Sequence, residues 1–261
     1  MTSPAAQLKS LQEQLKKSAS KTLIDEPFVF EEMATISMHF DHYSIQSVMY
    51  KHDPEYLVLG YTRTMMGFLF FQPEPKNIAM IGLGGGSLAK YCAKYLPNTH
   101  FTSIEINEQV IALREKFNIP DNSATFNVLH ANGADYVASK SDSVDVLLID
   151  GFDENGHPAK LCSAGFYDNC YAKLKDGGVM VVNLLASDLK FGTYAARMRD
   201  SFDGKVVVVD AEDDGNRVAF AYKGGGFPIT IETLLDSTRH LESKHPIPLH
   251  NTAKKILQRL R

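Results

Sequence analysis

The chain has 261 residues, with 27 basic and 31 acidic side chains and a net charge of −4. It lacks the basic excess of a nucleic-acid surface and any apolar run near the ~20 residues of a membrane helix. Its three cysteines have neither metal-type nor redox-type spacing. We therefore expect a cytoplasmic protein with no metal and with neither nucleic-acid nor membrane partners.

The N-terminal part is predicted to hold two small units. Residues 1–26 carry leucines at helical spacing among Lys, Gln and Ser, which predicts an amphipathic helical segment; a frayed tail is the alternative. Residues 27–60 consist of β-rich runs broken by turn signals, which predicts a small antiparallel β domain of three or four strands. Residues 61–261 are predicted to form one larger α/β domain.

A compact apolar run at 61–71 is predicted to form a short helix, because Gln-Pro-Glu-Pro follows it. Arg63 is embedded in this run, and a cation in apolar surroundings is costly unless it is paired. Two interpretations stay open. Arg63 binds an anionic group such as a carboxylate, or it closes a structural ion pair.

The stretch from 78 to 107 predicts a strand, a glycine loop, a helix and a second strand. The loop glycines permit positive φ and a close approach of backbone to ligand: Gly82, Gly84, Gly85 and Gly86. Ser87 is placed to cap the helix, and Glu105 ends the second strand, where an acid binds both hydroxyls of a ribose. The combination indicates an adenosine-type ligand; the alternative is a tight turn with Glu105 on the surface.

A helix at 108–117 and a strand at 124–129 are predicted next, followed by Asn132 and Gly133. The side-chain oxygen of Asn132 is a candidate acceptor for the adenine amino group. The alternative is an ordinary Asn-Gly turn.

A buried strand at 144–149 ends in Asp150, and Asp153 follows on an irregular loop. Ligands of open α/β sheets lie outside the carboxyl ends of the strands, so both acids are expected to face the same crevice as the glycine loop. A carboxylate there can accept a proton from an amine nucleophile or hold an ammonium group. The alternative is an Asx-turn that caps the next helix.

The remaining elements are predicted as a helix, a strand, a helix and a strand pair, at 163–174, 179–184, 189–201, and 205–210 with 217–222. The run 175–178 is interpreted as the C-cap of the first helix. The strand pair is linked too closely for a helical crossover and must be antiparallel. A doubly wound, Rossmann-type sheet with an antiparallel terminal hairpin is typical of the methyltransferase fold. One or two short helices are expected in the tail.

From about residue 43 to 184 the chain resembles the spermidine synthase family of aminopropyltransferases. The resemblance lies in Gln46, in the glycine loop 82–87, in Glu105, in Asn132-Gly133-Ala134 and in Asp150-Gly151-Phe152-Asp153. Gly156, Pro158 and Phe166-Tyr167 extend it.

The resemblance implies a donor, an acceptor and roles for these residues. The donor is S-adenosylmethionine or its decarboxylated form, used as a co-substrate, the acceptor is a small-molecule amine, and a homodimer is expected. Asp150 and Asp153 are the expected catalytic residues, with Asp150 as general base and Asp153 holding the amine. The expected donor-binding residues are Gln46, Gly82, Gly84, Gly85, Gly86, Glu105, Ile106, Asn132, Gly133 and Asp150. The expected acceptor-binding residues are Arg63, Tyr61, Phe152 and Asp153.

Three departures from the family keep other functions open. One is that the family's acceptor-binding Tyr and the acids around it have no counterpart in the short segment 61–76. The family's glycine loop has an Asp, which pairs with the donor amine, where this chain has Gly85. Arg63 adds a cation near the place where the family binds cations. A methyltransferase that uses S-adenosylmethionine itself, with Arg63 on the donor carboxylate, is one alternative; a non-catalytic nucleoside-binding protein is the other.

Overall fold

The computed structural model describes residues 26–40, 45–139, 143–152, 156–213, 215–225, 227 and 229–260. The predicted helical segment lies outside this range except for residue 26, as does Asp153. The division of the chain at residues 26 and 60 stays a prediction.

The N-terminal meander is a three-stranded antiparallel sheet in the order β1–β2–β3. Its strands are β1 (Phe28–Glu31), β2 (Thr35–His39) and β3 (Ser47–Tyr50). Met38 and Met49 are buried in the main core, so one face of this small sheet packs against the rest of the protein. The prediction of three or four strands is confirmed with three.

The central sheet has seven strands in the order β6-β5-β4-β7-β8-β10-β9. Its strands are β4 (Asn77–Ile81), β5 (His100–Glu105), β6 (Phe126–His130), β7 (Val144–Ile149), β8 (Leu174–Leu185), β9 (Val206–Asp210) and β10 (Asn216–Tyr222). Strands β4 to β8 pair in parallel, whereas β10 runs antiparallel to both β8 and β9. The strand order reverses at β4, where β5 lies on one side and β7 on the other, and such a switch point opens a ligand crevice.

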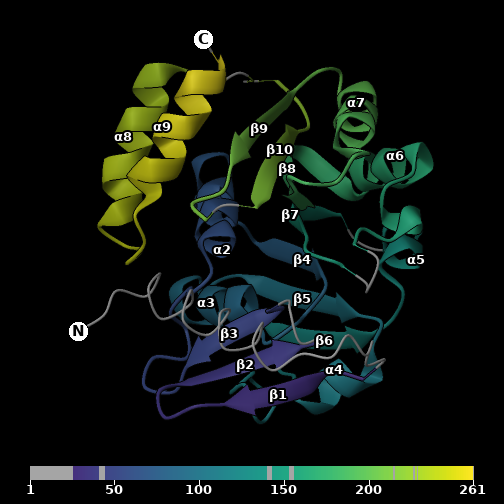
Figure 1. The fold of residues 1–261 in the computed structure, drawn as a ribbon. Coiled ribbons are helices and arrows are strands. Elements are labelled where there is room, and N and C mark those ends of the chain that lie inside the picture. The colour runs from purple at the N-terminus through teal and green to yellow at the C-terminus, as the bar shows by residue number, and fades with distance from the viewer. Residues whose placement is uncertain are drawn as a thin grey trace.

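Helices cover both faces of this sheet (Figure 1). They are α2 (Gly60–Met65), η1 (Met66–Phe70), α3 (Ser87–Tyr95), α4 (Glu108–Ala112), α5 (Gly133–Ala138), η2 (Ala159–Leu161), α6 (Ala164–Lys173), α7 (Phe191–Ser201), α8 (Ile231–Glu242) and α9 (Leu249–Leu260). Alternate residues of β4 enter different cores: Ile78 and Met80 pack on the side of α3, and Ala79 and Ile81 on the side of α6. The predicted doubly wound fold with a terminal antiparallel hairpin is confirmed.

Three local predictions are wrong. Ser87 is the first residue of α3 rather than its cap, and Gly86 takes the cap position with φ 68° and no side-chain bond. The helix predicted at 108–117 ends at Ala112. The run 175–178 does not cap a helix but belongs to β8, where Gly177 has φ 80° and donates its N–H to the Lys223 carbonyl at 2.8 Å.

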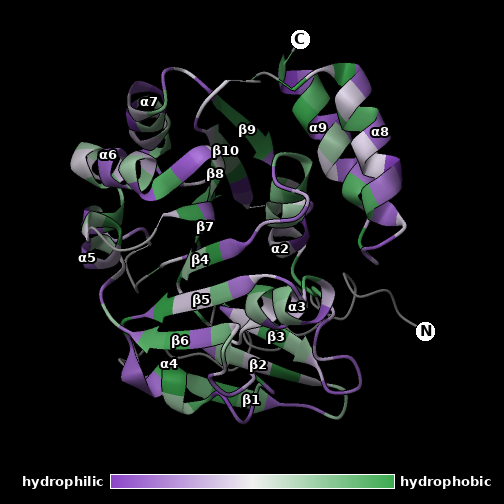
Figure 2. Ribbon diagram, turned by 180° about the vertical axis from the view of Figure 1, so that it is seen from behind, coloured by the Kyte–Doolittle hydropathy of each residue, from purple (hydrophilic) through white to green (hydrophobic). Residues whose placement is uncertain are grey.

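The two C-terminal helices lie beside the β9 edge of the sheet, and Figure 2 shows hydrophobic and hydrophilic residues alternating along them. Leu249 and Ile256 of α9 are buried in the main core. Among the helices that the structure describes, none combines the length and apolar composition of a membrane span. The cysteines Cys92, Cys162 and Cys170 are buried free thiols.

Candidate functional site

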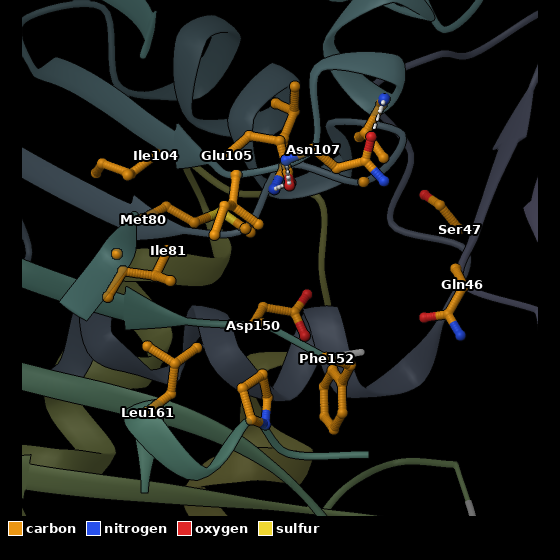
Figure 3. Close-up of a pocket in the computed structure, with 18 of the residues that line it drawn as sticks. Gln46, Ser47, Met80, Ile81, Ile104, Glu105, Asn107, Asp150, Phe152 and Leu161 are labelled. Atoms are coloured by element: carbon orange, nitrogen blue, oxygen red, sulfur yellow. Dashed lines mark hydrogen bonds between the residues drawn. The ribbon is translucent and has the colours of Figure 1, made fainter. Parts of the chain in front are cut away.

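A cavity of about 590 Å³ lies at the carboxyl ends of β4, β5 and β7. Its floor is formed by the glycine loop and by the residues that end these strands, and its outer wall by β2, β3 and the residues beside them. Figure 3 shows Asp150 pointing into the space between Glu105 and Phe152, with Ser47 of β3 and the preceding Gln46 facing it. The switch point of the sheet is therefore a real pocket, closed on one side by the N-terminal strands.

Gly82 brings the glycine loop against the strand that carries Asp150. It has φ 96°, and a Cβ at this position would collide with the backbone carbonyl of Asp150. Its N–H donates to the Ile104 carbonyl at 2.8 Å, and Asp150 N–H donates to the Ile81 carbonyl at 2.9 Å. Only glycine allows this approach, because any side chain would separate the two strand ends.

Glu105 is a buried carboxylate with a fixed orientation. Its Oε2 accepts the Leu83 N–H at 2.9 Å, and its Oε1 accepts the Asn107 N–H at 2.8 Å. Burial raises the pKa of Glu105, while these backbone donors act in the opposite direction. Each oxygen keeps further acceptor capacity toward the cavity, which suits a pair of vicinal hydroxyls.

Asp150 carries the second carboxylate of the cavity. Asn183 Nδ2 donates to its Oδ1 at 2.9 Å, and the Tyr61 hydroxyl donates to its Oδ2 at 3.1 Å. Burial raises the pKa of Asp150, and the two hydrogen bonds lower it in part. A carboxylate that is held in place, with a raised pKa, fits a general base for a proton released in the cavity.

Asn132 lines the cavity, but its side-chain oxygen is already engaged. It accepts the N–H of Ala134 at 2.9 Å and that of Asp135 at 3.4 Å, and so caps α5. The structure thus makes Asn132 the N-cap of α5, which is neither the free acceptor nor the Asn-Gly turn that the sequence left open. Its side-chain NH2 group, and not its oxygen, is left to contact a base in the cavity.

The structure brings most of the predicted residues together and separates a few. Those that line the cavity are Gln46, Gly82, Gly84, Glu105, Ile106, Asn132, Gly133, Asp150, Tyr61 and Phe152. Gly85 and Gly86 are absent from the lining, and a Cβ at Gly85 would lie 2.5 Å from Ser47 Oγ and 2.7 Å from the Phe117 ring. Asp153 lies outside the described residues.

Arg63 was predicted to contact substrate, and the structure places it elsewhere. Its Nε lies 2.6 Å from Glu212 Oε2, and it does not line the cavity. A structural ion pair, the alternative for this residue, is therefore the arrangement observed. The reason is direction: α2 points Tyr61 toward Asp150 and Arg63 toward the loop after β9.

Sequence reasoning missed Ser47 and Asn183. Ser47 lines the cavity beside the glycine loop, and no local pattern marks it. Asn183 is 3% exposed and is the polar residue within the otherwise apolar run Val179–Leu185 of β8. An amide in a buried central strand must find hydrogen-bond partners, and this signal could have indicated its role.

The comparisons with known proteins agree with this geometry. The sequence model described as "Spermine/spermidine synthase domain" matches residues 58–187. A curated polyamine aminopropyltransferase of Chromobacterium violaceum is 34% identical over 231 residues, which are 88% of this chain and 88% of the relative.

Solved structures share the fold at lower identity. A probable spermidine synthase from Corynebacterium glutamicum superposes with a TM-score of 0.68 at 16% identity, over 91% of this chain and 94% of the other. Human methyltransferase-like protein 13, in complex with SAH, gives a TM-score of 0.66 at 20% identity, over 71% and 92%. On the strength of its sequence relatives, the chain belongs to the spermidine synthase family of polyamine aminopropyltransferases.

Proposed function

We propose that this protein transfers an aminopropyl group from a decarboxylated S-adenosylmethionine donor to a small amine, with Asp150 as the general base. The observation that carries the proposal is the pair of oriented carboxylates in one cavity, Glu105 at the end of β5 and Asp150 just after β7. The relative from Chromobacterium violaceum bears the name of this activity. No described feature favours the methyltransferase or the non-catalytic alternative.

The chemistry needs one displacement and one proton transfer. The acceptor nitrogen attacks the carbon next to the donor sulfonium, the carbon–sulfur bond breaks, and its electron pair stays on sulfur. The products are an alkylated ammonium and a neutral thioether nucleoside. Before the attack, Asp150 takes a proton from the acceptor ammonium and so frees the nitrogen lone pair, while Glu105 binds the ribose and fixes the donor for in-line attack.

The donor pocket suits an adenosine with an extended sulfonium arm. Glu105 offers acceptors to two hydroxyls, Ile106 and Leu161 supply apolar walls, and the side-chain nitrogen of Asn132 is left to donate to the base. Gly85 offers no carboxylate to the sulfonium arm of the donor. We therefore propose that the contact of this arm with Asp150 sets the position of the reacting carbon. The preference between the two donors is then expected to be smaller than in relatives that carry an acid at this position.

The test is a reaction with both donors and a panel of mono- and diamines, followed by mass spectrometry. We expect an alkylated amine and a thioether nucleoside in equal amounts from the decarboxylated donor. Asp150→Asn should lower kcat by about 100-fold or more, while the exposed, distant His100→Gln should match the wild type. Methylated product from S-adenosylmethionine, with no aminopropyl product, would contradict the proposal.

The other partner assignments are part of the same proposal. By analogy with the family we propose a homodimer, and from the three buried free thiols a location in the cytoplasm. Sedimentation at several protein concentrations tests the dimer, and a strictly monomeric chain would contradict it.

A further inference from the structure

The two side chains that hold Asp150 are themselves held by one turn. Tyr61 lies in α2 and Asn183 in β8, yet both elements contact the segment that joins β9 to β10. This segment, together with Asn216 at the start of β10, is named here the β9–β10 turn and is described at residues 211–213 and 215–216. None of these residues lines the cavity.

The first contact joins α2 to the β9–β10 turn through charge. Arg63 Nε donates to Glu212 Oε2 at 2.6 Å, with only 16% and 12% of the two side chains exposed. The same guanidinium donates through Nη1 to the carbonyls of Leu57 at 2.6 Å and Val58 at 2.9 Å, and lies 3.9 Å from Asp213 Oδ1. A guanidinium with several acceptors around it fixes both its own segment and the turn.

Backbone contacts fix the residues on either side of Tyr61. The Gly60 N–H donates to Asp213 Oδ2, and a Cβ at Gly60 would collide with that carboxylate. The Glu212 N–H donates to Thr64 Oγ1 at 3.1 Å. Tyr61 is thus set between two positions that the turn anchors.

The second contact orients the amide of Asn183. Asn216 Nδ2 donates to Asn183 Oδ1 at 2.9 Å, so the amide nitrogen of Asn183 is the group that faces Asp150. The Ala186 N–H donates to the Gly215 carbonyl at 2.8 Å, which ties the turn to the end of β8. If the Asn183 amide rotated by half a turn, its Oδ1 would face the Asp150 carboxylate oxygen. The hydrogen bond from Asn216 to Asn183 Oδ1 opposes this rotation.

We infer that the β9–β10 turn positions the general base, with Arg63 and Glu212 acting through Tyr61 and Asn216 acting through Asn183. The inference rests on the proposed function, because it takes Asp150 as the base. It assigns Arg63 to the support of the site instead of to substrate. Arg63, Glu212 and Asn216 are positioning residues, since none of the three lines the cavity.

The hydrogen bonds give this positioning a measurable consequence. Burial raises the pKa of Asp150, and the bonds from Asn183 and Tyr61 lower it. His157, on the loop after Asp150, is the other titratable neighbour whose charge lowers this pKa. Loss of either donor therefore raises the pKa further and moves the acid limb of the kcat profile to higher pH.

The test combines kinetics with a titration that needs no turnover. The pH profile of kcat and the ¹³Cγ titration of Asp150, identified by its absence in Asp150→Asn, are measured for Arg63→Gln, Glu212→Gln and Asn216→Ala. We expect each to raise the Asp150 pKa by about one unit, which is about tenfold in kcat below the limb. Arg63→Gln on a Tyr61→Phe background should add nothing, because the donor is already gone.

The matched control is Arg217→Gln, which removes an ion pair to Asp210 in the same hairpin, outside the contacts that hold Asp150. It should leave the Asp150 titration unchanged. An unchanged Asp150 pKa in Arg63→Gln and Glu212→Gln, or an equal shift on the Tyr61→Phe background, would overturn the inference. Glu212→Gln removes the charge that holds the Arg63 guanidinium but keeps the size of the side chain, which guards against a variant that fails to fold. If the titration shifts as expected but no amine is turned over, the proposed function fails and the positioning stands.

Discussion

A single missing methyl group decides how closely the glycine loop approaches the strand that carries Asp150. Gly82 has a positive φ, and its Cα faces the backbone carbonyl of Asp150 at a distance that leaves no room for Cβ. The loop and this strand end therefore pack backbone against backbone, and the orientation of Glu105 also depends on the loop, because its Oε2 accepts the N–H of Leu83. The relative position of the two carboxylates is therefore set first by the packing of backbone against backbone.

Gly82→Ala should therefore lower the free energy of unfolding by about 2–4 kcal/mol, since it adds a backbone clash to a strained φ. Urea unfolding measures the loss. The control is Gly192→Ala in α7, where a Cβ meets nothing within 4 Å, and this change should stay within about 1 kcal/mol of the wild type. Equal stability of the two variants would contradict the account of Gly82.

Single residues also show where sequence reasoning stops. The pattern around Arg63 predicted that a cation in an apolar segment needs a partner, and left a ligand and an ion pair open. The partner, Glu212, lies 149 positions later in the chain, and no local spacing connects the two. Glu105 and Asp150 could be placed at one edge because each ends a buried parallel strand, a position that local pattern does reveal.

Strands that are buried on both faces could be predicted from the sequence. Segments whose structure depends on pairing with a distant part of the chain could not. β4 and β7 are short apolar runs and form strands as expected. In the run 175–178, the glycines resemble a helix C-cap, but β8 extends through them because their backbone pairs with the chain around Lys223. The pairing partner lies beyond any local window, so the C-cap interpretation failed.

The hairpin of α8 and α9 is joined to α3 by a buried histidine. His245 lies between the two helices, 4% exposed, and its Nδ1 lies 3.2 Å from the Tyr91 hydroxyl. Burial lowers the pKa of His245 from 6.5 to about 4. Below pH 6.5 the unfolded chain therefore binds a proton at this residue that the native protein does not.

Stability should accordingly fall as the pH drops from 6.5 to about 4, with His245 contributing up to about 3 kcal/mol to the loss. His245→Phe keeps an aromatic ring against Tyr91 but cannot titrate, so its unfolding free energy should fall less over this interval. Urea unfolding at pH 7, 5.5 and 4 makes the comparison, with His100→Gln as the exposed-histidine control. Parallel losses in wild type and His245→Phe would show that other groups are responsible.

On the scale of the whole molecule, the cavity is a joint between two sheets. Ser47 begins β3 of the small N-terminal sheet and Gln46 directly precedes it, whereas Glu105 ends β5 and Asp150 directly follows β7 of the central sheet (Figure 3). A ligand that touches both must link them, and binding to the native state alone stabilises it by about 2.7 kcal/mol at 100 times Kd. We therefore expect ligand binding in this cavity to stabilise the attachment of the small sheet.

Hydrogen exchange can test this coupling. A non-reactive S-adenosyl thioether should slow amide exchange in β2 and β3 as well as at the ends of β4, β5 and β7. Glu105→Gln should weaken the protection in both sheets together, since it removes a carboxylate from the proposed ribose contact. Protection confined to the central sheet would mean that the ligand does not bridge the joint.

The buried thiols have a practical consequence. Burial raises the pKa of Cys92 and Cys170 and raises that of Cys162 to about 11, so thiolate is scarce in the native protein at neutral pH. An alkylating reagent must then wait for the chain to open. Cys92 lies in α3 and Cys170 in α6, on opposite faces of the central sheet. The rate at which each thiol is modified therefore reports how often the helical layer on its own face opens locally.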